Sequence, residues 1–120
     1  MNQVKLKRIE SQIVKEVSDI LLNETNDELL KTITITGCEV ASDLSYAKIY
    51  FTSFSDMENK AIEAEMEEAS SYIRMKLADQ IELRHTPKLR FIYDTSIAYG
   101  EKIERIIREI HEEQKEDLND

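Results

Sequence analysis

Apolar residues recur along this chain with two different periods, and these periods predict the order of its helices and strands. Between residues 5 and 23 they fall three and four positions apart, which is typical of one face of an amphipathic helix. Residues 32–41 and 46–54 alternate between apolar and polar positions, which predicts two half-buried strands. The turn-forming sequence Ser-Asp-Leu-Ser lies between them, so we expect an antiparallel hairpin.

The alternation also predicts which side of each strand faces the core. Gly37 interrupts it in the first strand and indicates a β-bulge, because a glycine inside a strand often marks an extra residue. The core-facing positions of the second strand are expected to be Ala47, Ile49 and Phe51. The opposite face of this strand is expected to carry Tyr46, Lys48, Tyr50 and Thr52.

A long amphipathic helix is predicted over residues 56–83, with Asp56 as its N-cap. Its apolar stripe consists of Ile62, Met66, Ala69, Ile73, Leu77 and Ile81. Ser70 and Ser71 interrupt this stripe, and adjacent serines often mark a bend because their hydroxyls compete for backbone hydrogen bonds. We therefore expect a helix of two halves with a bend at the two serines.

Pro87, the only proline, separates this helix from a third strand. It has no N–H group and disfavours helical geometry in the preceding residue, so the helical region ends before it. The core-facing positions of the strand, residues 88–94, are expected to be Leu89, Phe91 and Tyr93. The other face of this strand is expected to carry Lys88, Arg90 and Ile92.

The C-terminal part is predicted to contain one more helix and an acidic end. Ser96 is the expected N-cap of this helix, and its apolar face comprises Ile103, Ile106, Ile107 and Ile110. Residues 113–120 are acidic and nearly without apolar groups, so we expect a disordered tail after a single domain of residues 1–112. The order helix–strand–strand–helix–strand–helix predicts an α+β domain, with helices on one face of a three-stranded sheet.

Composition agrees with a single domain that has a heavily charged surface. Apolar residues make up 41% of the 120 residues and charged residues 34%, which is sufficient for one core. The sequence has no run of about 18 apolar residues that would span a membrane. It also lacks the apolar stretch of a secretory signal near its start, and it has one cysteine, so a cytoplasmic location is expected.

Positive charge is concentrated in one part of an acidic chain. The formal net charge of -9 argues against general attraction to nucleic acid. However, residues 69–108 contain eight basic and five acidic residues, whereas residues 24–68 contain three basic and eleven acidic ones. Charges are screened over about 8 Å at physiological salt, so a partner senses the local patch. The basic region is compatible with phosphate binding and also with an ordinary solvated surface.

Patterns typical of enzymes are scarce in this sequence. With Gly37 and Gly100 as the only glycines there is no glycine-rich phosphate loop, and one cysteine with two distant histidines does not match zinc-ligand spacing. Cys38 and His85 are the conceivable nucleophile and base, but a lone cysteine on a strand is more typical of a small buried residue. We expect neither an enzyme nor a bound metal or cofactor.

Two surfaces offer other kinds of site. If the strand phases hold, one sheet face carries Tyr46, Lys48, Tyr50, Lys88 and Arg90. Aromatic and basic groups on an open sheet can stack bases and hold phosphates, although an ordinary solvated face is the alternative. The long helix also has an acidic side formed by Glu63, Glu65, Glu67 and Glu68. This side is compatible with solvation or with docking of a basic protein.

Two stretches of the chain have distinctive patterns. The first is "HTPKLRFIYDTSIAYGEKIERII", with its Pro, Leu, Phe, aromatic, Asp and Ser positions followed by a helix containing Gly and Ile. The second is "ASDLSYAKIYFT", in which a Ser-Asp-Leu turn precedes an Ala-Lys-aliphatic-Tyr strand. These stretches resemble signatures of the ribosome-binding factor A family, which comprises bacterial assembly factors of the small ribosomal subunit. The resemblance extends over roughly residues 4 to 110.

This resemblance implies a type II KH-like fold with a helix–kink–helix unit. The family kink is usually Ala, any residue, Gly; here it is Ala69, Ser70 and Ser71, with serine in place of glycine. The implied function is to bind immature small subunits through rRNA and to favour a productive rRNA conformation, which matters most at low temperature. The implied partners are the small subunit and its rRNA, with ribosomal proteins and an assembly GTPase as further candidates.

The cations around the bend and the proline turn are the expected contacts to the RNA backbone. The candidate RNA-binding residues are Lys5, Lys7, Arg8, Lys48, Arg74, Lys76, Arg84, His85, Lys88 and Arg90. The free protein is expected to be a monomer with no membrane or small-molecule partner. The alternative is a protein-interaction module in which the acidic segment 63–68 docks a basic ribosomal protein.

Overall fold

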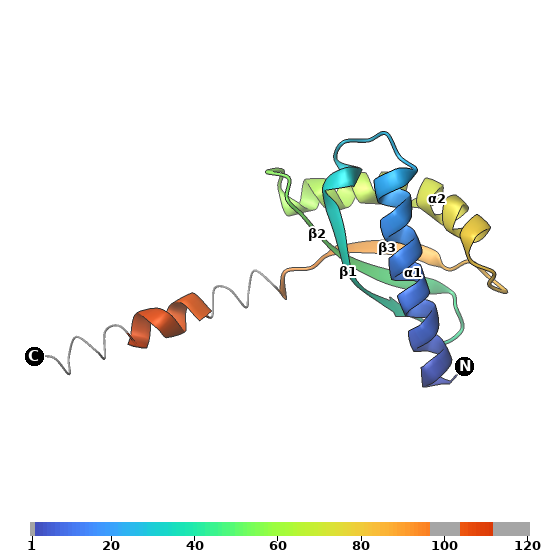
Figure 1. Cartoon of the computed structure of the whole chain (residues 1–120), viewed down its shortest axis with the longest axis horizontal. Coiled ribbons are helices and arrows are strands. Elements are labelled where there is room, and N and C mark those ends of the chain that lie inside the picture. The colour runs from blue at the N-terminus through green and yellow to red at the C-terminus, as the bar shows by residue number, and fades with distance from the viewer. Residues whose placement is uncertain (1, 97–103, 112–120) are drawn as a thin grey trace, which may run out of the picture.

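The predicted hairpin forms the centre of the sheet. In the computed structural model, which describes residues 2–96 and 104–111, β1 (Ile33–Val40) pairs antiparallel with β2 (Tyr46–Ser53). On the other side of β2, β3 (Lys88–Tyr93) pairs in parallel, so the strand order is β1-β2-β3 (Figure 1). A parallel pair requires a long crossover, and a helix supplies it here.

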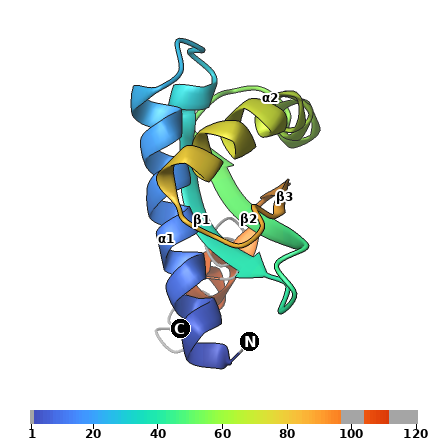
Figure 2. The same ribbon diagram turned by 90° about the vertical axis from the view of Figure 1, so that its right-hand side faces the viewer.

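Two long helices cover one face of this sheet. α1 (Gln3–Asn23) packs against β1, α2 (Asn59–Gln80) packs against β3, and the helices also contact each other (Figures 1 and 2). The Asn2 side chain caps α1 by accepting a 2.8 Å hydrogen bond from the N–H of Lys5. A 3-10 turn, η1 (Leu30–Thr32), leads into β1. Within the described ranges, none of the helices has the length and hydropathy needed to cross a membrane.

The strand phases predicted from the alternation are confirmed by burial. Ala47, Ile49 and Phe51 of β2 are completely buried beneath the helices. The Phe51 ring meets that of Phe91 on β3 edge to face, with 6.4 Å between the ring centroids. Burial of each large apolar side chain stabilises the fold by about 1.5–3 kcal/mol, so this layer joins helices and sheet into one core.

The β-bulge predicted at Gly37 is also confirmed. The register between β1 and β2 shifts between Ile35 and Gly37, which leaves Thr36 as the extra residue. The Thr36 hydroxyl donates a 2.7 Å hydrogen bond to the carboxylate of Asp94, just after β3. The bulge therefore allows β1 to hold the end of β3, although β2 lies between them.

Asp94 and Ser96 form a local hydrogen-bonded turn directly after β3. The Asp94 carboxylate accepts hydrogen bonds from the backbone N–H and the hydroxyl of Ser96. These bonds, together with that from Thr36, lower the pKa of Asp94, with the Ser96 hydroxyl as the largest cause. The predicted N-cap role of Ser96 depends on residues 97–103, which lie outside the described residues.

The N-cap prediction for the long helix is wrong. α2 begins at Asn59, and its N-cap residue is Glu58, which makes no side-chain capping bond. The hydroxyls of Ser53 and Ser55 accept hydrogen bonds from backbone N–H groups two residues further on. These serine turns hold the chain outside helical geometry past Asp56, so the helix starts later than the sequence pattern predicts.

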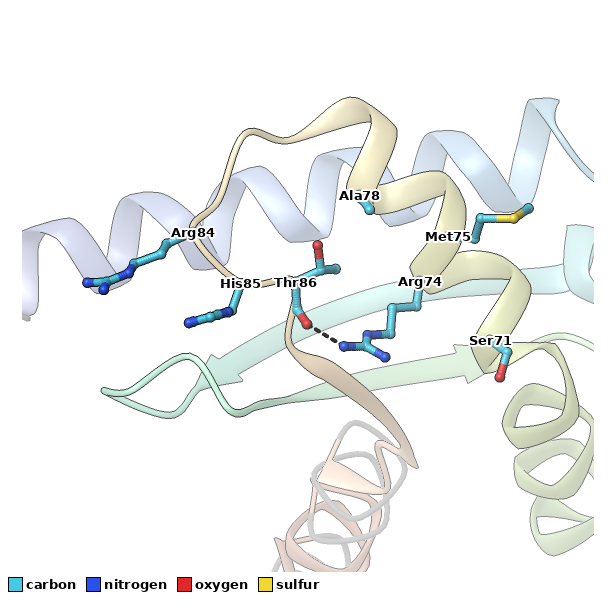
Figure 3. Close-up of a pocket in the computed structure, with 7 residues that line it drawn as sticks. All are labelled: Ser71, Arg74, Met75, Ala78, Arg84, His85 and Thr86. Atoms are coloured by element: carbon cyan, nitrogen blue, oxygen red, sulfur yellow. Dashed lines mark hydrogen bonds between the residues drawn. The ribbon is translucent and has the colours of Figure 1, made fainter.

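α2 is one continuous helix whose two halves run in different directions. Figure 2 shows the first half nearly end-on and the second half lying across the view, and Figure 3 places Ser71 where the two meet. The Ser70 hydroxyl donates a 2.7 Å hydrogen bond to the carbonyl oxygen of Glu67, a contact that often bends helices. The buried residues of both halves are Ile62, Met66, Ile73 and Leu77.

The last helix is not packed as the sequence predicts. Residues 104–111 are helical, and Ile106, Ile107 and Ile110 are between 41% and 48% exposed. The expectation that these isoleucines are buried against the sheet is therefore not met, and the helices that pack on the sheet are α1 and α2 (Figure 1). Ile103 and the predicted tail at 113–120 lie outside the described residues.

Candidate nucleic-acid interface

The candidate site is a groove beside the C-terminal half of α2, the turn around Pro87 and the start of β3. Pro87 is fully buried, and its ring fixes the backbone of this turn against the core. We call the site the cationic groove. It consists of two adjoining hollows that share Ser71 and Arg74, and its lining residues are Ser70, Ser71, Arg74, Arg84, His85, Thr86 and Lys88, together with Met75, Ala78, Leu89 and Glu67.

Arg74 joins the two walls of the cationic groove. Its Nε atom donates a 3.1 Å hydrogen bond to the carbonyl oxygen of Pro87. Its Nη2 atom donates a 2.8 Å hydrogen bond to the carbonyl oxygen of Thr86 (Figure 3). These bonds use two of the five guanidinium N–H donors, so donors remain for an anion in the groove. Arg74 therefore fixes the turn and also contributes positive charge.

The other cations of the groove come from the turn and the strand. Arg84, His85 and Lys88 are exposed. Arg84 and His85 line one hollow with Arg74, although their side chains extend from the turn in the direction away from it (Figure 3). Ser71 faces the groove from the bend of α2, and its hydroxyl makes no hydrogen bond within the described residues. Cations and an available hydroxyl along one groove suit the binding of phosphate groups.

The sheet face predicted to carry aromatic and basic groups exists. The register sets Tyr46 beside Lys88 and Lys48 beside Arg90, so the four side chains leave the sheet on one face. They line a hollow with Leu89 and Glu67 that lies next to the cationic groove. The face therefore extends the positively charged surface around the edge strand β3.

Tyr50 has different surroundings on the same sheet face. Its hydroxyl donates a 3.4 Å hydrogen bond to the carboxylate of Glu39 on β1. Desolvation raises the pKa of Tyr50, and the charge of Glu39 raises it further. This part of the face, next to a carboxylate, is less suited to phosphate than the part around Lys48 and Arg90.

Lys76 lies away from the groove despite being close to Arg74 in sequence. Its Nζ atom is 5.7 Å from the ring centroid of Tyr72, one turn earlier in α2. The Tyr72 hydroxyl donates a 2.6 Å hydrogen bond to the carbonyl oxygen of Glu24, at the end of α1. This flank of α2 therefore faces α1, whereas Ser71, Arg74 and Ala78 face the groove.

The cations of α1 form another separate group. Lys5, Lys7 and Arg8 are exposed on a helix that packs against β1, at the opposite edge of the sheet from β3. The structure therefore does not bring them to the cationic groove. Of the ten candidates, it gathers Arg74, Arg84, His85 and Lys88 in the groove and Lys48 and Arg90 beside it.

Sequence reasoning overlooked the first half of α2 as part of this surface. Lys60, Glu63, Ala64 and Glu67 line a hollow with β3 residues that include Arg90. These four residues are spaced three, one and three positions apart, so they share one helical face. This spacing is the sequence signal from which their common surface could have been predicted. The acidic side of the helix is thus partly turned towards the edge strand rather than wholly towards solvent.

The structure does not bring Cys38 and His85 together as a catalytic pair. Cys38 lies on β1, at one edge of the sheet, and His85 precedes β3 at the other. Burial, with smaller effects of Glu10 and Glu39, raises the pKa of the Cys38 thiol to about 12. The thiol is therefore protonated at neutral pH and a poor nucleophile. Residues 2–96 and 104–111 also contain no cluster of His, Cys, Asp and Glu suited to a metal.

The fold and this groove define a small α+β protein with a localised cationic surface on an acidic body. The sequence model of the family described as ribosome-binding factor A matches residues 5–107. A relative of that name from Leuconostoc mesenteroides is 37% identical over 114 residues, which cover 93% of this chain and 97% of the relative. This chain belongs to the ribosome-binding factor A family.

Solved structures agree with this assignment at the level of the fold. The crystal structure of ribosome-binding factor A from Thermus thermophilus matches with a TM-score of 0.66 and 19% identity, covering 73% of this chain and 94% of that one. A homology model of the Thermus factor, fitted into a cryo-EM map of its complex with the 30S subunit, matches with a TM-score of 0.61 and 19% identity. That match covers 73% of this chain and 93% of the other.

Proposed function

We propose that this protein is a non-enzymatic assembly factor of the small ribosomal subunit that holds rRNA in its cationic groove. The observation that carries the proposal is the grouping of Arg74, Arg84, His85 and Lys88 along two adjoining hollows, which share Ser71 and Arg74, in a chain with a net charge of -9. Membership of a family of ribosome-binding factors supports it, as does the 30S complex of the Thermus factor.

A type II KH-like arrangement of residues 1–112 is part of this proposal. The order of α1, β1, β2, a bent α2 and β3 supports it, with Ala69, Ser70 and Ser71 in the place of the kink. A glycine at position 71 would offer RNA only its backbone. Serine adds a hydroxyl that can donate to a phosphate oxygen.

The proposed mechanism requires differential binding and no bond chemistry. A protein that binds one rRNA conformer more tightly shifts the population towards it by that difference in affinity. The contribution is largest in the cold, where misfolded rRNA helices escape slowly. The factor acts in the cytoplasm as a monomer and leaves the mature subunit, with ribosomal proteins and an assembly GTPase as further partners in this step.

Co-sedimentation of the full chain with immature and mature small subunits over a salt series tests this function. We expect preference for the immature particle, because the productive conformer is stabilised before maturation ends. The logarithm of affinity should fall linearly with the logarithm of salt concentration. Arg84→Glu and Lys88→Glu should each weaken binding. Each should also reduce the steepness of this salt dependence by about the amount that one phosphate contact contributes. Lys15→Glu, an exposed change on α1, is the matched control.

Equal binding to both particles, or wild-type binding by Arg84→Glu and Lys88→Glu, would contradict the proposal. The protein-interaction alternative gives a different pattern in the same experiment. Under that alternative, reversing the charge of Glu65 and Glu68 weakens binding more than reversing the charge of the groove cations. That result would identify the acidic side of α2 as the contact to a basic ribosomal protein.

A further inference from the structure

A second hollow lies where the edge strand β3 begins, and it is continuous with the cationic groove. It has a volume of about 610 Å³ and is lined by Tyr46, Lys48, Glu67, Lys88, Leu89 and Arg90. This volume is within the usual range of small-ligand pockets. Lys88 and Leu89 also line the groove beside Ser71 and Arg74. A polymer held in the groove can therefore reach this hollow by passing around β3.

The chemistry of this hollow combines an exposed aromatic ring with three cations. Tyr46 is 45% exposed, although burial of an aromatic ring ordinarily stabilises a fold. The register sets it beside Lys88, with Lys48 and Arg90 one pair further along the same face. Rings that stack bases, next to cations that neutralise phosphates, are the usual means of holding single-stranded nucleic acid.

Tyr46 is better suited to stacking than Tyr50 or Phe54. The Tyr50 hydroxyl is hydrogen bonded to Glu39, whose carboxylate repels a phosphate backbone. Phe54 is 79% exposed but lies after the far end of β2, in the connection to α2. Tyr46 is the aromatic residue among those that line a hollow with Lys48, Lys88 and Arg90.

We propose that this hollow binds the base of one unpaired nucleotide, in the RNA whose backbone lies in the cationic groove. The base stacks on the ring of Tyr46, and Lys48 and Arg90 neutralise the flanking phosphates. Glu67 is the carboxylate among the lining residues, and a carboxylate accepts hydrogen bonds from exocyclic amino groups. The site therefore favours adenine, cytosine or guanine over uracil. This inference rests on the proposed RNA-binding function.

The test compares two labelled probes by fluorescence anisotropy with the full chain. One is an RNA octamer of adenosine, and the other is an octamer of abasic ribose phosphate with the same charge. We expect the wild-type protein to bind the adenosine octamer about tenfold more tightly, the order that one stacked base contributes. The ratio of the two affinities, adenosine octamer over abasic octamer, should fall close to one in Tyr46→Ala and Tyr46→Leu. Tyr46→Phe should retain the wild-type ratio. Uridine octamers should bind more weakly than adenosine octamers, and Glu67→Gln should reduce this difference.

The controls separate this inference from the proposed function. Phe54→Ala removes an exposed aromatic ring away from the hollow and should leave the ratio unchanged. Lys88→Glu should weaken binding of both octamers, since it acts on phosphates. A ratio unaltered in both Tyr46→Ala and Tyr46→Leu, with far-UV circular dichroism confirming folding, overturns base binding at Tyr46 and leaves the groove proposal intact. Salt-independent binding of both probes would instead count against the groove.

Discussion

At the scale of single residues, Arg74 shows how a side chain gains a second role once its partners are known. In the sequence it is one of several cations near the paired serines. In the structure its guanidinium holds the carbonyl groups of Thr86 and Pro87, which fixes the turn that presents Arg84 and His85. A planar fork with several donors can hold both carbonyls at once, and an ammonium group at the end of a flexible chain cannot reproduce this geometry.

Arg74→Lys should therefore impair the protein although the charge is kept. We expect the free energy of unfolding to fall by about 1–2 kcal/mol, the order of the hydrogen bonds lost. Affinity for RNA should fall as well, because the turn carrying Arg84 is less well positioned. Urea unfolding and anisotropy titrations measure these two quantities. If Arg74→Lys matched the wild type in both, a role limited to positive charge would be sufficient.

Asp94 gives a pH dependence at the same scale. Hydrogen bonds from Ser96 and Thr36 lower the pKa of its carboxyl in the folded protein below the unfolded value of about 3.9. Its contribution to stability is therefore fully present above about pH 4 and is lost as the pH falls through the folded pKa. Asp94→Asn should reduce the free energy of unfolding at pH 7, and the difference from the wild type should shrink below pH 4. A constant difference in unfolding experiments from pH 7 to pH 3 would refute this account.

At the scale of elements, α2 has two polar flanks with different surroundings. Ser71, Arg74 and Ala78 face the cationic groove, whereas Tyr72 and Lys76 face the end of α1. Residues three or four positions apart share a helical face, so a shift of two positions moves a side chain away from the groove. Proximity in sequence to the bend is therefore insufficient to identify an RNA contact.

Charge reversal should separate these flanks. We expect Lys76→Glu to change RNA affinity less than twofold at physiological salt, since its charge lies outside the groove and is screened over about 8 Å. Arg84→Glu should lower affinity at least tenfold, because it replaces a favourable phosphate contact with a repulsive one. Anisotropy titrations at matched salt concentration measure both. Equal losses in the two variants would mean that RNA contacts both flanks of α2.

At the scale of the whole molecule, a group of cations is concentrated in one place on an acidic protein. The groove collects cations from α2, the proline turn and β3, while the chain as a whole carries -9. Local patches of this kind orient a protein on a charged partner more strongly than net charge does. The surrounding carboxylates restrict general attraction to nucleic acid, so contact should require the groove itself.

Removal of residues 113–120 tests the proposed extent of the domain. We expect the free energy of unfolding to stay the same, because this acidic segment offers almost no apolar surface to a core. RNA affinity at low salt should rise slightly as repulsive carboxylates are lost, with the difference disappearing at high salt. Urea unfolding and anisotropy titrations provide the two measurements. A clear loss of stability would place part of the folded domain beyond residue 112.

The sequence by itself determined the helices, the strands and the inward positions of the sheet. Hydrophobic periodicity and the local chemistry of Gly37, Ser70 and Pro87 depend on neighbours along the chain, which a sequence reveals directly. The tertiary structure decided the joint between Arg74 and the proline turn and the exclusion of Lys76 from the groove. It also decided that α1 and α2 are the helices that pack on the sheet, while Ile106, Ile107 and Ile110 stay exposed. These outcomes depend on packing between distant segments, for which local periodicity carries no signal.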